Sequence, residues 1–143
     1  MSDNSSISAH IEESGESAFA VFMEVSGHHL VGDEPVSAGG ANLGPSPYDL
    51  LLAALGECTA MTVRWYAKRM NWPLDKVEVR MGHTKREVVG AGSKIDVFTK
   101  DILLHGPDLT QEQRDKLLDV AGKCPVQRSL LATPVIRTTL VPS

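Results

Sequence analysis

Two short segments near the start of the chain, rich in Val, Phe and other apolar residues, have the character of β-strands. Residues 18–25 (AFAVFMEV) and 27–31 (GHHLV) predict two strands that a tight turn at Ser26 and Gly27 connects. Residues 1–16 are polar and have no period, so we expect them to form a mobile tail, with strand structure beginning near Ser17.

A second pair of strands is predicted in the middle of the chain. Residues 76–84 (KVEVRMGHT) alternate apolar residues with polar or small ones, which is the pattern of a half-buried strand. Residues 94–105 are the expected partner, across a turn at residues 90–93 (GAGS). Residues 134–141 predict a last strand near the end of the chain.

Residues 33–45 are rich in Gly, Pro and Ala and predict a loop, and the residues after this loop favour the start of a helix. Ser46 is the expected N-cap, Pro47 suits the first helical position, and Asp49 stands where a carboxylate completes a capping box. The following residues are apolar nearly all round until the segment at 71–73 (NWP). We therefore expect a long central helix that ends near residue 70 and is buried on most faces.

Two shorter helices are predicted in the second half. Thr110 and Gln113 form a capping box for a helix that ends at Gly122. A second, over residues 125–131, is expected to begin just after Cys124, because proline suits the first helical position. The order of strands and helices has no regular βαβ alternation. It predicts an α+β fold with an antiparallel sheet, as a single domain over residues 17–143.

Composition and charge limit the possible partners. Hydrophobic residues make up 42% of the chain and charged residues 22%, as in globular proteins, and the net charge of −4 argues against a nucleic-acid binder. Residues 1–17 lack the regions of a secretory signal, and the apolar run at 50–63 is too short for a bilayer. We expect the cytoplasm and no membrane partner. No Lys or Arg precedes Arg64, so a site that needs a cation takes it from the second half.

Cys58 and Cys124 are the two cysteines of the chain, and their separation of 66 positions excludes a C-x-x-C redox motif or a zinc pattern. One interpretation is that both are buried, unreactive thiols, because free cysteine is often buried. The other is reactivity, which requires a cation near the sulfur, since burial alone raises the pKa of a thiol. On local grounds Cys124 ionises more easily, because it lies at a predicted helix start with Lys123 and Arg128 close in sequence.

Other candidate chemistry is weaker. His83 alternates within a strand and is interpreted as a core or interface residue, and the histidines at 28–29 lack ligands at metal-binding spacing, so we expect no metal. The glycines of residues 39–44 form no phosphate-binding motif, and we expect no cofactor. A cysteine-based hydrolase stays as an alternative, although no His or Asp has the spacing of a triad.

Residues 44–62 (GPSPYDLLLAALGECTAMT), followed far downstream by residues 123–130 (KCPVQRSL), resemble the OsmC/Ohr family. The resemblance implies an OsmC-like α+β fold with antiparallel sheets packed around a long buried helix. It also implies an intertwined homodimer with active sites at the subunit interface. In the family's peroxidases the helix cysteine attacks an organic hydroperoxide and the Cys-Pro cysteine resolves the sulfenic acid as a disulfide. By this resemblance Cys58 is the peroxidatic and Cys124 the resolving cysteine of an enzyme of oxidative-stress defence. A dithiol reductant, either a small molecule or a lipoylated protein, would recycle the disulfide.

Two features depart from the family's peroxidases. Those enzymes carry a glutamate directly after the proline that opens the helix, where this chain has Tyr48 with Asp49 beside it. They also use an N-terminal arginine, whereas this chain has none before Arg64. Either Asp49 and a later cation such as Arg128 take these places, or peroxidase activity is weak or lost. The alternative function is then a non-catalytic dimer that binds a small hydrophobic ligand at its interface.

Overall fold

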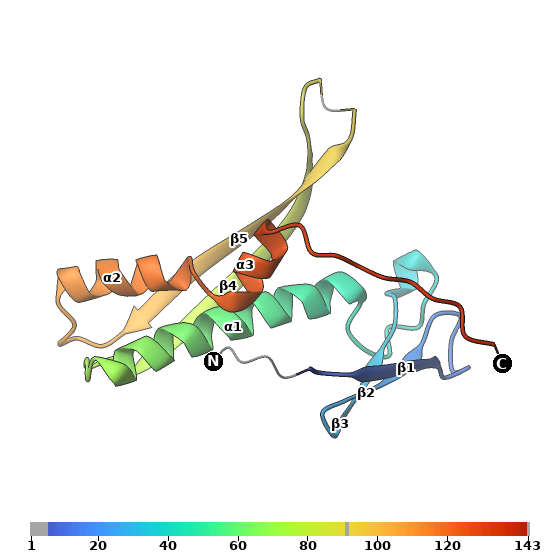
Figure 1. Ribbon diagram of the computed structural model, residues 1–143, viewed down its shortest axis with the longest axis horizontal. Helices are drawn as coiled ribbons and strands as arrows, with labels where there is room; N and C mark the ends of the chain where they lie inside the picture. Colours follow the sequence, from blue (N-terminus) through green and yellow to red (C-terminus); the bar gives the residue numbers. More distant parts are fainter. Residues whose placement is uncertain (1–5, 91, 143) are drawn as a thin grey trace. The chain divides into compact units, whose positions relative to one another are not determined.

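The computed structural model describes residues 6–90 and 92–142. The chain folds into two compact units, residues 1–53 and residues 54–143. Antiparallel sheets alternate with helices along the chain, which confirms the α+β class (Figure 1). Among the described residues, no helix combines the length and the apolar character that a membrane crossing requires. The single domain over residues 17–143 stays a prediction.

The first unit contains an antiparallel sheet in the order β1 (Ala9–Glu13), β2 (Val21–Val25) and β3 (His28–Gly32). Ser26 and Gly27 connect β2 to β3 with positive φ angles of 50° and 80°, a twist that suits a two-residue hairpin turn. The predicted hairpin is therefore confirmed.

Strand β1 lies where the sequence predicts a tail, so the expected strand start near Ser17 is wrong. Ala9 pairs with Val25 and Glu13 with Val21, which places β1 along the edge of the sheet. Every residue of β1 is exposed. A strand without a buried face needs no apolar alternation, and that is why the hydrophobic pattern did not indicate it.

Asp33 anchors the loop that follows the sheet. Its carboxylate accepts hydrogen bonds from the Ser17 hydroxyl at 2.9 Å and from the backbone N–H groups of Glu34, Ala41 and Leu43 at 2.8, 3.0 and 3.3 Å. The residue is buried, and these bonds satisfy its charge. One carboxylate thereby holds a loop that is rich in Gly and Pro.

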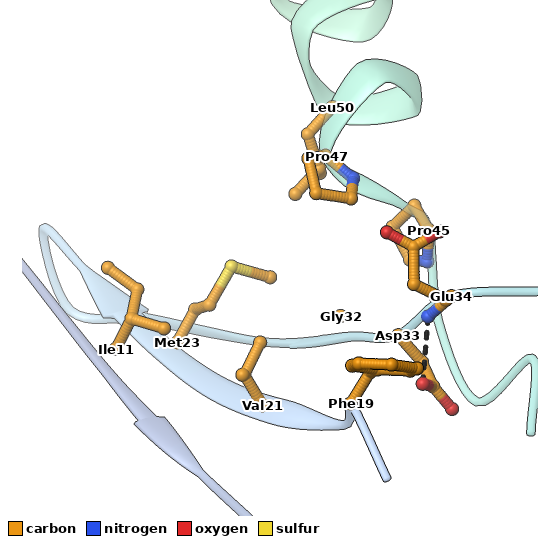
Figure 2. Close-up of a pocket in the computed structure, with 10 residues that line it drawn as sticks. All are labelled: Ile11, Phe19, Val21, Met23, Gly32, Asp33, Glu34, Pro45, Pro47 and Leu50. Carbon is orange, nitrogen blue, oxygen red and sulfur yellow. Dashed lines mark hydrogen bonds between the residues drawn. The ribbon is translucent and has the colours of Figure 1, made fainter. Parts of the chain in front are cut away.

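An apolar cavity of about 380 Å³ lies in the first unit (Figure 2). Ile11, Val21 and Met23 of the sheet line it, together with Pro47 and Leu50 at the start of the first long helix. Figure 2 also shows the hydrogen bond that the backbone N–H of Glu34 donates to the carboxylate of Asp33.

Helix α1 (Pro47–Arg69) follows the short 3₁₀ helix η1 (Val36–Ala38), and it begins in the first unit and continues into the second. Its start is the predicted capping box. The backbone N–H of Ser46 donates to the Asp49 carboxylate at 2.9 Å, and the N–H of Asp49 donates to the Ser46 hydroxyl at 3.5 Å. The helix ends just before Asn71, which has a φ of 54°.

The buried residues of α1 lie along one side of the helix, so the expectation of burial on most faces is wrong for the single chain. Met61 and Trp65, on other faces, are 53% and 46% exposed. The described residues cover only the side of the helix that packs on the second unit's own elements. The buried positions recur at the spacing of one helix face and are Leu55, Gly56, Thr59, Val63 and Ala67.

Strands β4 (Lys76–Glu87) and β5 (Lys94–His105) form the predicted hairpin of the second unit. β4 continues beyond the predicted end at Thr84, and of the predicted turn residues, residue 91 lies outside the described residues. Gly56 lets α1 approach β4 closely, because a Cβ there would come within 2.9 Å of the Met81 Cγ atom.

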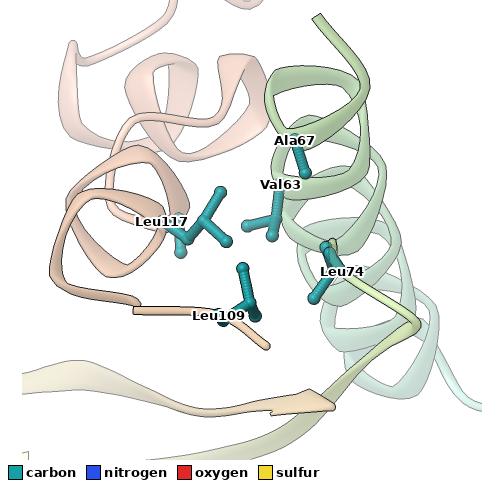
Figure 3. Close-up of a cluster of buried hydrophobic side chains, with 6 residues drawn as sticks. Val63, Ala67, Leu74, Leu109 and Leu117 are labelled. Atoms are coloured by element: carbon teal, nitrogen blue, oxygen red, sulfur yellow. The ribbon is translucent and has the colours of Figure 1, made fainter. Parts of the chain in front are cut away.

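Helix α2 (Gln111–Ala121) and helix α3 (Pro125–Leu131) occupy the predicted positions. Thr110 and Gln113 form the predicted capping box. The core of the unit lies between α1 and α2, where fully or nearly fully buried side chains point toward one another (Figure 3). They are Val63, Ala67, Leu74, Leu109, Leu117 and Ala121.

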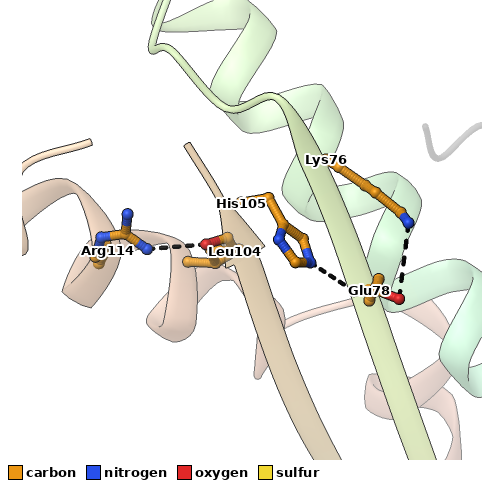
Figure 4. A network of polar contacts seen from close by, with 5 residues as sticks. All are labelled: Lys76, Glu78, Leu104, His105 and Arg114. Atoms are coloured by element: carbon orange, nitrogen blue, oxygen red, sulfur yellow. Dashed lines mark hydrogen bonds and ion pairs between the residues drawn. The ribbon is translucent and has the colours of Figure 1, made fainter. Parts of the chain in front are cut away.

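Polar contacts fasten the end of the hairpin that lies away from its turn (Figure 4). His105 of β5 is hydrogen-bonded to Glu78 of β4, whose carboxylate also lies 3.8 Å from the Lys76 ammonium. Arg114 of α2 donates to the Leu104 carbonyl at 2.9 Å. Helix α2 is thereby tied to the last residues of β5.

The predicted strand at residues 134–141 is not formed, which corrects the sequence prediction for the single chain. A strand requires a neighbour that supplies its backbone hydrogen bonds, and none of the strands in residues 6–90 and 92–142 pairs with this segment. Val135, Ile136 and Leu140 are 77%, 84% and 93% exposed.

Candidate functional site

Helix α1 and the start of α3 bring the two cysteines together. Both are free thiols, and the Cys58 thiol donates a hydrogen bond to the sulfur of Cys124. Cys58 is half-buried, whereas Cys124 has no exposed surface. Two residues that lie far apart in the sequence therefore form one dithiol site.

The first turn of α3 directs backbone N–H groups at both sulfurs. Cys124 is the N-cap residue, as predicted, and its sulfur accepts a hydrogen bond from the N–H of Gln127 at 3.4 Å. The N–H of Val126 donates to the sulfur of Cys58. Pro125 has no N–H and occupies the first helical position, which leaves the next two amides for the sulfurs.

Thr59 is the link between Cys124 and the rest of the site. Its side chain has no exposed surface, and its hydroxyl oxygen lies 3.5 Å from the Cys124 sulfur and 2.8 Å from the Leu55 carbonyl oxygen. A hydroxyl has one hydrogen, so it donates to either the sulfur or the carbonyl at any moment. A negative charge on sulfur favours donation to Cys124.

Lys100 brings a positive charge to this hydroxyl. Its ammonium nitrogen donates to the Thr59 oxygen at 3.1 Å and to the carbonyl of Ala121, at the end of α2, at 2.6 Å. The residue is half-buried on β5, opposite Met81 of β4. The two hydrogen bonds fix the ammonium group beside the buried hydroxyl.

These contacts lower the pKa of the Cys124 thiol below its usual range. Burial by itself acts to raise this pKa. Hydrogen bonds from Thr59, from the N–H of Gln127 and from Cys58 outweigh burial, and the charge of Lys100 adds to them. The sequence-based expectation that Cys124 ionises more easily than Cys58 agrees with this order.

Burial raises the pKa of the Cys58 thiol, and the hydrogen bond to Cys124 and the negative charge on that residue raise it further. Hydrogen bonds from the N–H of Val126 and from the Thr62 side chain act in the opposite direction and are outweighed. The surroundings of the two sulfurs therefore shift the two thiol pKa values in opposite directions.

Two further residues were predicted to take part in catalysis. The structure places the carboxylate of Asp49 in the capping box of α1, where its hydrogen bonds with Ser46 lower the pKa of the carboxyl. Arg128 lies exposed on α3, and the contacts that the described residues give to Cys58 and Cys124 do not include its side chain. The catalytic roles of Asp49 and Arg128 stay predictions.

Sequence reasoning missed Lys100 and Thr59. A signal for Lys100 was present, because it shares one face of β5 with Phe98, Ile102 and Leu104. A lysine among apolar residues on the half-buried face of a strand indicates a buried partner for its charge. Thr59 gave no such signal, because a threonine in a helix often bonds a carbonyl of the preceding turn.

A cavity of about 480 Å³ adjoins this site in the second unit. Lys100 and Gln127, which contact Thr59 and Cys124, also line the cavity. Its other walls are mostly apolar, with Leu55, Phe98 and Leu130 among them, and they also include Asp96. The cavity thus offers a mostly apolar space, with Lys100 and Asp96 as charged residues in its walls, next to residues that contact the dithiol site.

His83 of β4 makes its contacts away from the two cysteines. His83 lies 2.8 Å from the Asp96 carboxylate and stacks against Phe98 at a centroid distance of 4.8 Å. In the described part of the chain, His, Cys, Asp and Glu side chains do not gather in a group of three that would hold a metal ion.

Solved structures with similar folds cover most of the chain. A putative osmotic stress induced and detoxification response protein from Psychrobacter arcticus 273-4 has a TM-score of 0.71 at 17% identity, over 90% of this chain and 91% of that chain. The organic hydroperoxide resistance protein OsmC from Legionella pneumophila has a TM-score of 0.68 at 17% identity, over 90% and 91%. The organic hydroperoxide resistance protein OhrB of Bacillus subtilis has a TM-score of 0.60 at 16% identity, over 90% and 92%. At these identities the likeness establishes the fold.

The sequence itself also matches a known family. Comparison with curated proteins gives no match. The family model described as OsmC-like protein matches residues 39–139, which is well over half of the chain and includes Cys58, Lys100 and Cys124. The chain belongs to the OsmC-like protein family.

Proposed function

We propose that the protein is a thiol-dependent peroxidase that reduces organic hydroperoxides through Cys58 and Cys124, in defence against oxidative stress. The observation that carries this proposal is the contact between two free thiols with unequal surroundings. Similar folds in proteins named for organic hydroperoxide resistance support the class of substrate.

Cys58 is the sulfur that attacks the hydroperoxide, because it is half-buried and Cys124 has no exposed surface. The Cys58 sulfur bonds to the outer oxygen of the hydroperoxide, and the O–O bond breaks. The departing alkoxide takes up a proton and leaves as an alcohol. Cys58 has then been oxidised to a sulfenic acid and the hydroperoxide has been reduced.

Cys124 then closes the disulfide. Its thiolate attacks the Cys58 sulfur, the S–S bond forms, and the S–O bond breaks with release of hydroxide, which is protonated to water. A dithiol reductant restores both thiols by two successive exchange reactions and leaves as its own disulfide. The cycle begins with both cysteines reduced, so we place it in a reducing compartment such as the cytoplasm.

The cavity of about 480 Å³ supports an organic substrate rather than hydrogen peroxide. Its apolar walls would bind the carbon chain of a hydroperoxide and exclude water from it. Hydrogen peroxide has no apolar part and gains nothing from these walls. We therefore expect preference for the organic substrate.

We also propose that the protein acts as a homodimer. The exposed apolar residues of α1, such as Met61 and Trp65, and those of the C-terminal segment, such as Ile136, form surface that a second copy would cover. A stable interface of this kind would bury more than about 2,000 Å² in total.

The direct test measures consumption of an alkyl hydroperoxide, such as cumene hydroperoxide, with dihydrolipoamide or another dithiol as reductant. We expect turnover by the wild type, slower turnover with hydrogen peroxide, and none by Cys58→Ser. Cys124→Ser is expected to complete one oxidation and accumulate sulfenic acid on Cys58. Wild-type protein that consumes neither substrate would overturn the proposal.

The cavity of the first unit favours a second candidate function, that of a binding protein for a small apolar molecule (Figure 2). Its volume of about 380 Å³ and its lining by Ile11, Met23 and Leu50 suit an uncharged ligand. Binding of a fluorescent apolar probe that Leu50→Asp abolishes and Cys58→Ser leaves unchanged would favour this function over the peroxidase.

A further inference from the structure

We propose that Lys100 is a positioning residue that, through the Thr59 hydroxyl, keeps Cys124 ionised as the proton acceptor and resolving nucleophile of the dithiol pair. The redox roles rest on the proposed function. The effect of Lys100 on Cys124 does not, because it is argued from the contacts of the resting protein.

The geometry forms a continuous chain from a charge to a sulfur. The Lys100 ammonium donates to the Thr59 oxygen at 3.1 Å, and that oxygen lies 3.5 Å from the Cys124 sulfur. Thr59 and Cys124 have no exposed surface, so water does not compete for this contact. Donation from an ammonium polarises the hydroxyl and strengthens the hydrogen bond that it gives to a thiolate.

Among the described residues, the two basic residues closest to Cys124 in sequence, Lys123 and Arg128, do not appear in the contacts of its sulfur. Lys123 precedes it in the sequence, but the ammonium of Lys123 lies 2.9 Å from the Asp119 carboxylate. Arg128 is exposed on α3. The N–H of Gln127 and the thiol of Cys58 complete the donors that face the sulfur. Lys100 is therefore the cation that these contacts connect to the thiolate.

An ionised Cys124 would account for how Cys58 can attack although burial raises the pKa of its own thiol. The Cys58 thiol already donates its hydrogen to the Cys124 sulfur. As the hydroperoxide approaches, this proton moves to Cys124 and the Cys58 thiolate attacks the outer oxygen. The proton then passes to the departing alkoxide, which leaves as the alcohol.

The same proton transfer prepares the second step. Loss of the proton to the alkoxide returns Cys124 to its thiolate form beside the new sulfenic acid of Cys58. The thiolate attacks the Cys58 sulfur, and hydroxide leaves. In sum, one thiol, one thiolate and one hydroperoxide give one disulfide, one alcohol and one hydroxide ion, so atoms and charge balance.

The same contacts of Cys124 also favour reduction of the disulfide. A reductant thiolate attacks the more accessible Cys58 sulfur, and Cys124 leaves as the thiolate that Thr59, Gln127 and Lys100 stabilise. A leaving thiol of low pKa departs faster in disulfide exchange. The second thiol of the reductant then frees Cys58.

The test is a titration that requires no hydroperoxide. In the Cys58→Ser protein, Cys124 is the remaining thiol, and its thiolate is followed by ultraviolet absorbance against pH. We expect Lys100→Met in this protein to raise the pKa of Cys124 by about 1 unit or more. Lys100→Arg, which keeps the charge, should restore most of the shift. Thr59→Val, which removes the hydroxyl at nearly equal size, should raise this pKa as well.

Lys123→Met is the matched control, because it removes a lysine adjacent in sequence whose charge is directed at Asp119. It is expected to leave the titration unchanged. Circular dichroism checks that each variant is folded, and if Lys100→Met fails to fold, Thr59→Val and Lys100→Gln decide the outcome. An unshifted titration in the folded variants overturns the inference. A shift on Arg128→Ala in place of Lys100→Met overturns it too.

The outcomes separate this inference from the proposed function. A shifted titration with no peroxide turnover in the wild type overturns the peroxidase and leaves the role of Lys100 standing. Peroxide turnover with an unshifted titration overturns the role of Lys100 and leaves the peroxidase standing. If both hold, Lys100→Met with both cysteines present should slow both the oxidation of Cys58 and the closure of the disulfide, because an un-ionised Cys124 is a poor acceptor for the Cys58 proton and a poor nucleophile toward the sulfenic acid.

Discussion

The hydroxyl oxygen of Thr59 lies 3.5 Å from the sulfur of Cys124, across 65 positions of sequence. Thr59 directly follows Cys58 in α1, so adjacent residues of one helix contact the same distant sulfur with a thiol and a hydroxyl. The thiol of Cys58 is the proposed reaction partner of Cys124, and the hydroxyl of Thr59 is the proposed link between Cys124 and the charge of Lys100. A substitution at Thr59 therefore tests the site without removing either cysteine.

We predict that oxidation by an alkyl hydroperoxide stabilises the folded protein. A disulfide between Cys58 and Cys124 would close a long loop of the unfolded chain and raise the free energy of unfolding by about 2–4 kcal/mol. Urea unfolding of oxidised and reduced protein measures the difference. Cys124→Ser treated in the same way should show no gain, and equal stability of oxidised and reduced wild type would contradict the cross-link.

Replacement of Leu117 by alanine should destabilise the second unit by about 2–5 kcal/mol, because the side chain has no exposed surface and fills the core between α1 and α2. Leu118→Ala is the control on the same helix, since Leu118 is 59% exposed. Its effect should be below about 0.5 kcal/mol. Chemical denaturation measures the free energy of unfolding of both variants. A similar loss of stability in the two would contradict the assignment of Leu117 to the core.

Asp33 should make the stability of the protein depend on acid pH. Burial acts to raise the pKa of its carboxyl, but hydrogen bonds from Ala41, Ser17 and other donors of the loop outweigh it and hold the pKa below 3.8. A folded-state pKa below the unfolded value contributes stability above the unfolded value, and this is lost as pH falls through the folded one.

Asp33→Asn is therefore expected to be less stable than wild type at neutral pH, with the difference shrinking as pH falls below 3.8. Urea unfolding at a series of pH values measures this. Glu34→Gln is the control, because it removes the carboxylate at the adjacent position, which is not the one that accepts the hydrogen bonds of the loop. A stability difference between Asp33→Asn and wild type that is independent of pH would show that the charge of Asp33 does not matter.

The homodimer is tested by mass in solution. We expect the wild type to have the mass of two chains at micromolar concentration by light scattering, and Ile136→Asp to shift it toward the monomer, because a charge at a buried interface is costly. Val89→Asp is the control, since Val89 is fully exposed at the turn of the hairpin. A wild-type protein that is folded and monomeric would refute the dimer.

Local signals were sufficient for most elements of the fold. The capping boxes at Ser46 and Thr110 and the turn at Ser26 and Gly27 gave the element boundaries closely, because these residues satisfy backbone groups within a few positions. Local signals failed for strand β1, which was not predicted, and for the C-terminal strand, which was predicted and is not formed. Pairing of a strand depends on a partner elsewhere in the chain, and the residues of the strand alone do not specify it.

The sequence by itself determined the two cysteines, the N-cap position of Cys124 and the need for a cation from the second half of the chain. Only the tertiary structure decided which cation lies close to the sulfur of Cys124. Lys100 reaches Cys124 through Thr59 because α1, β5 and the start of α3 meet in the second unit, whereas Arg128 is nearer in sequence and exposed. The pKa of a thiol depends on the charges and donors within a few ångströms, and folding alone determines which groups lie there.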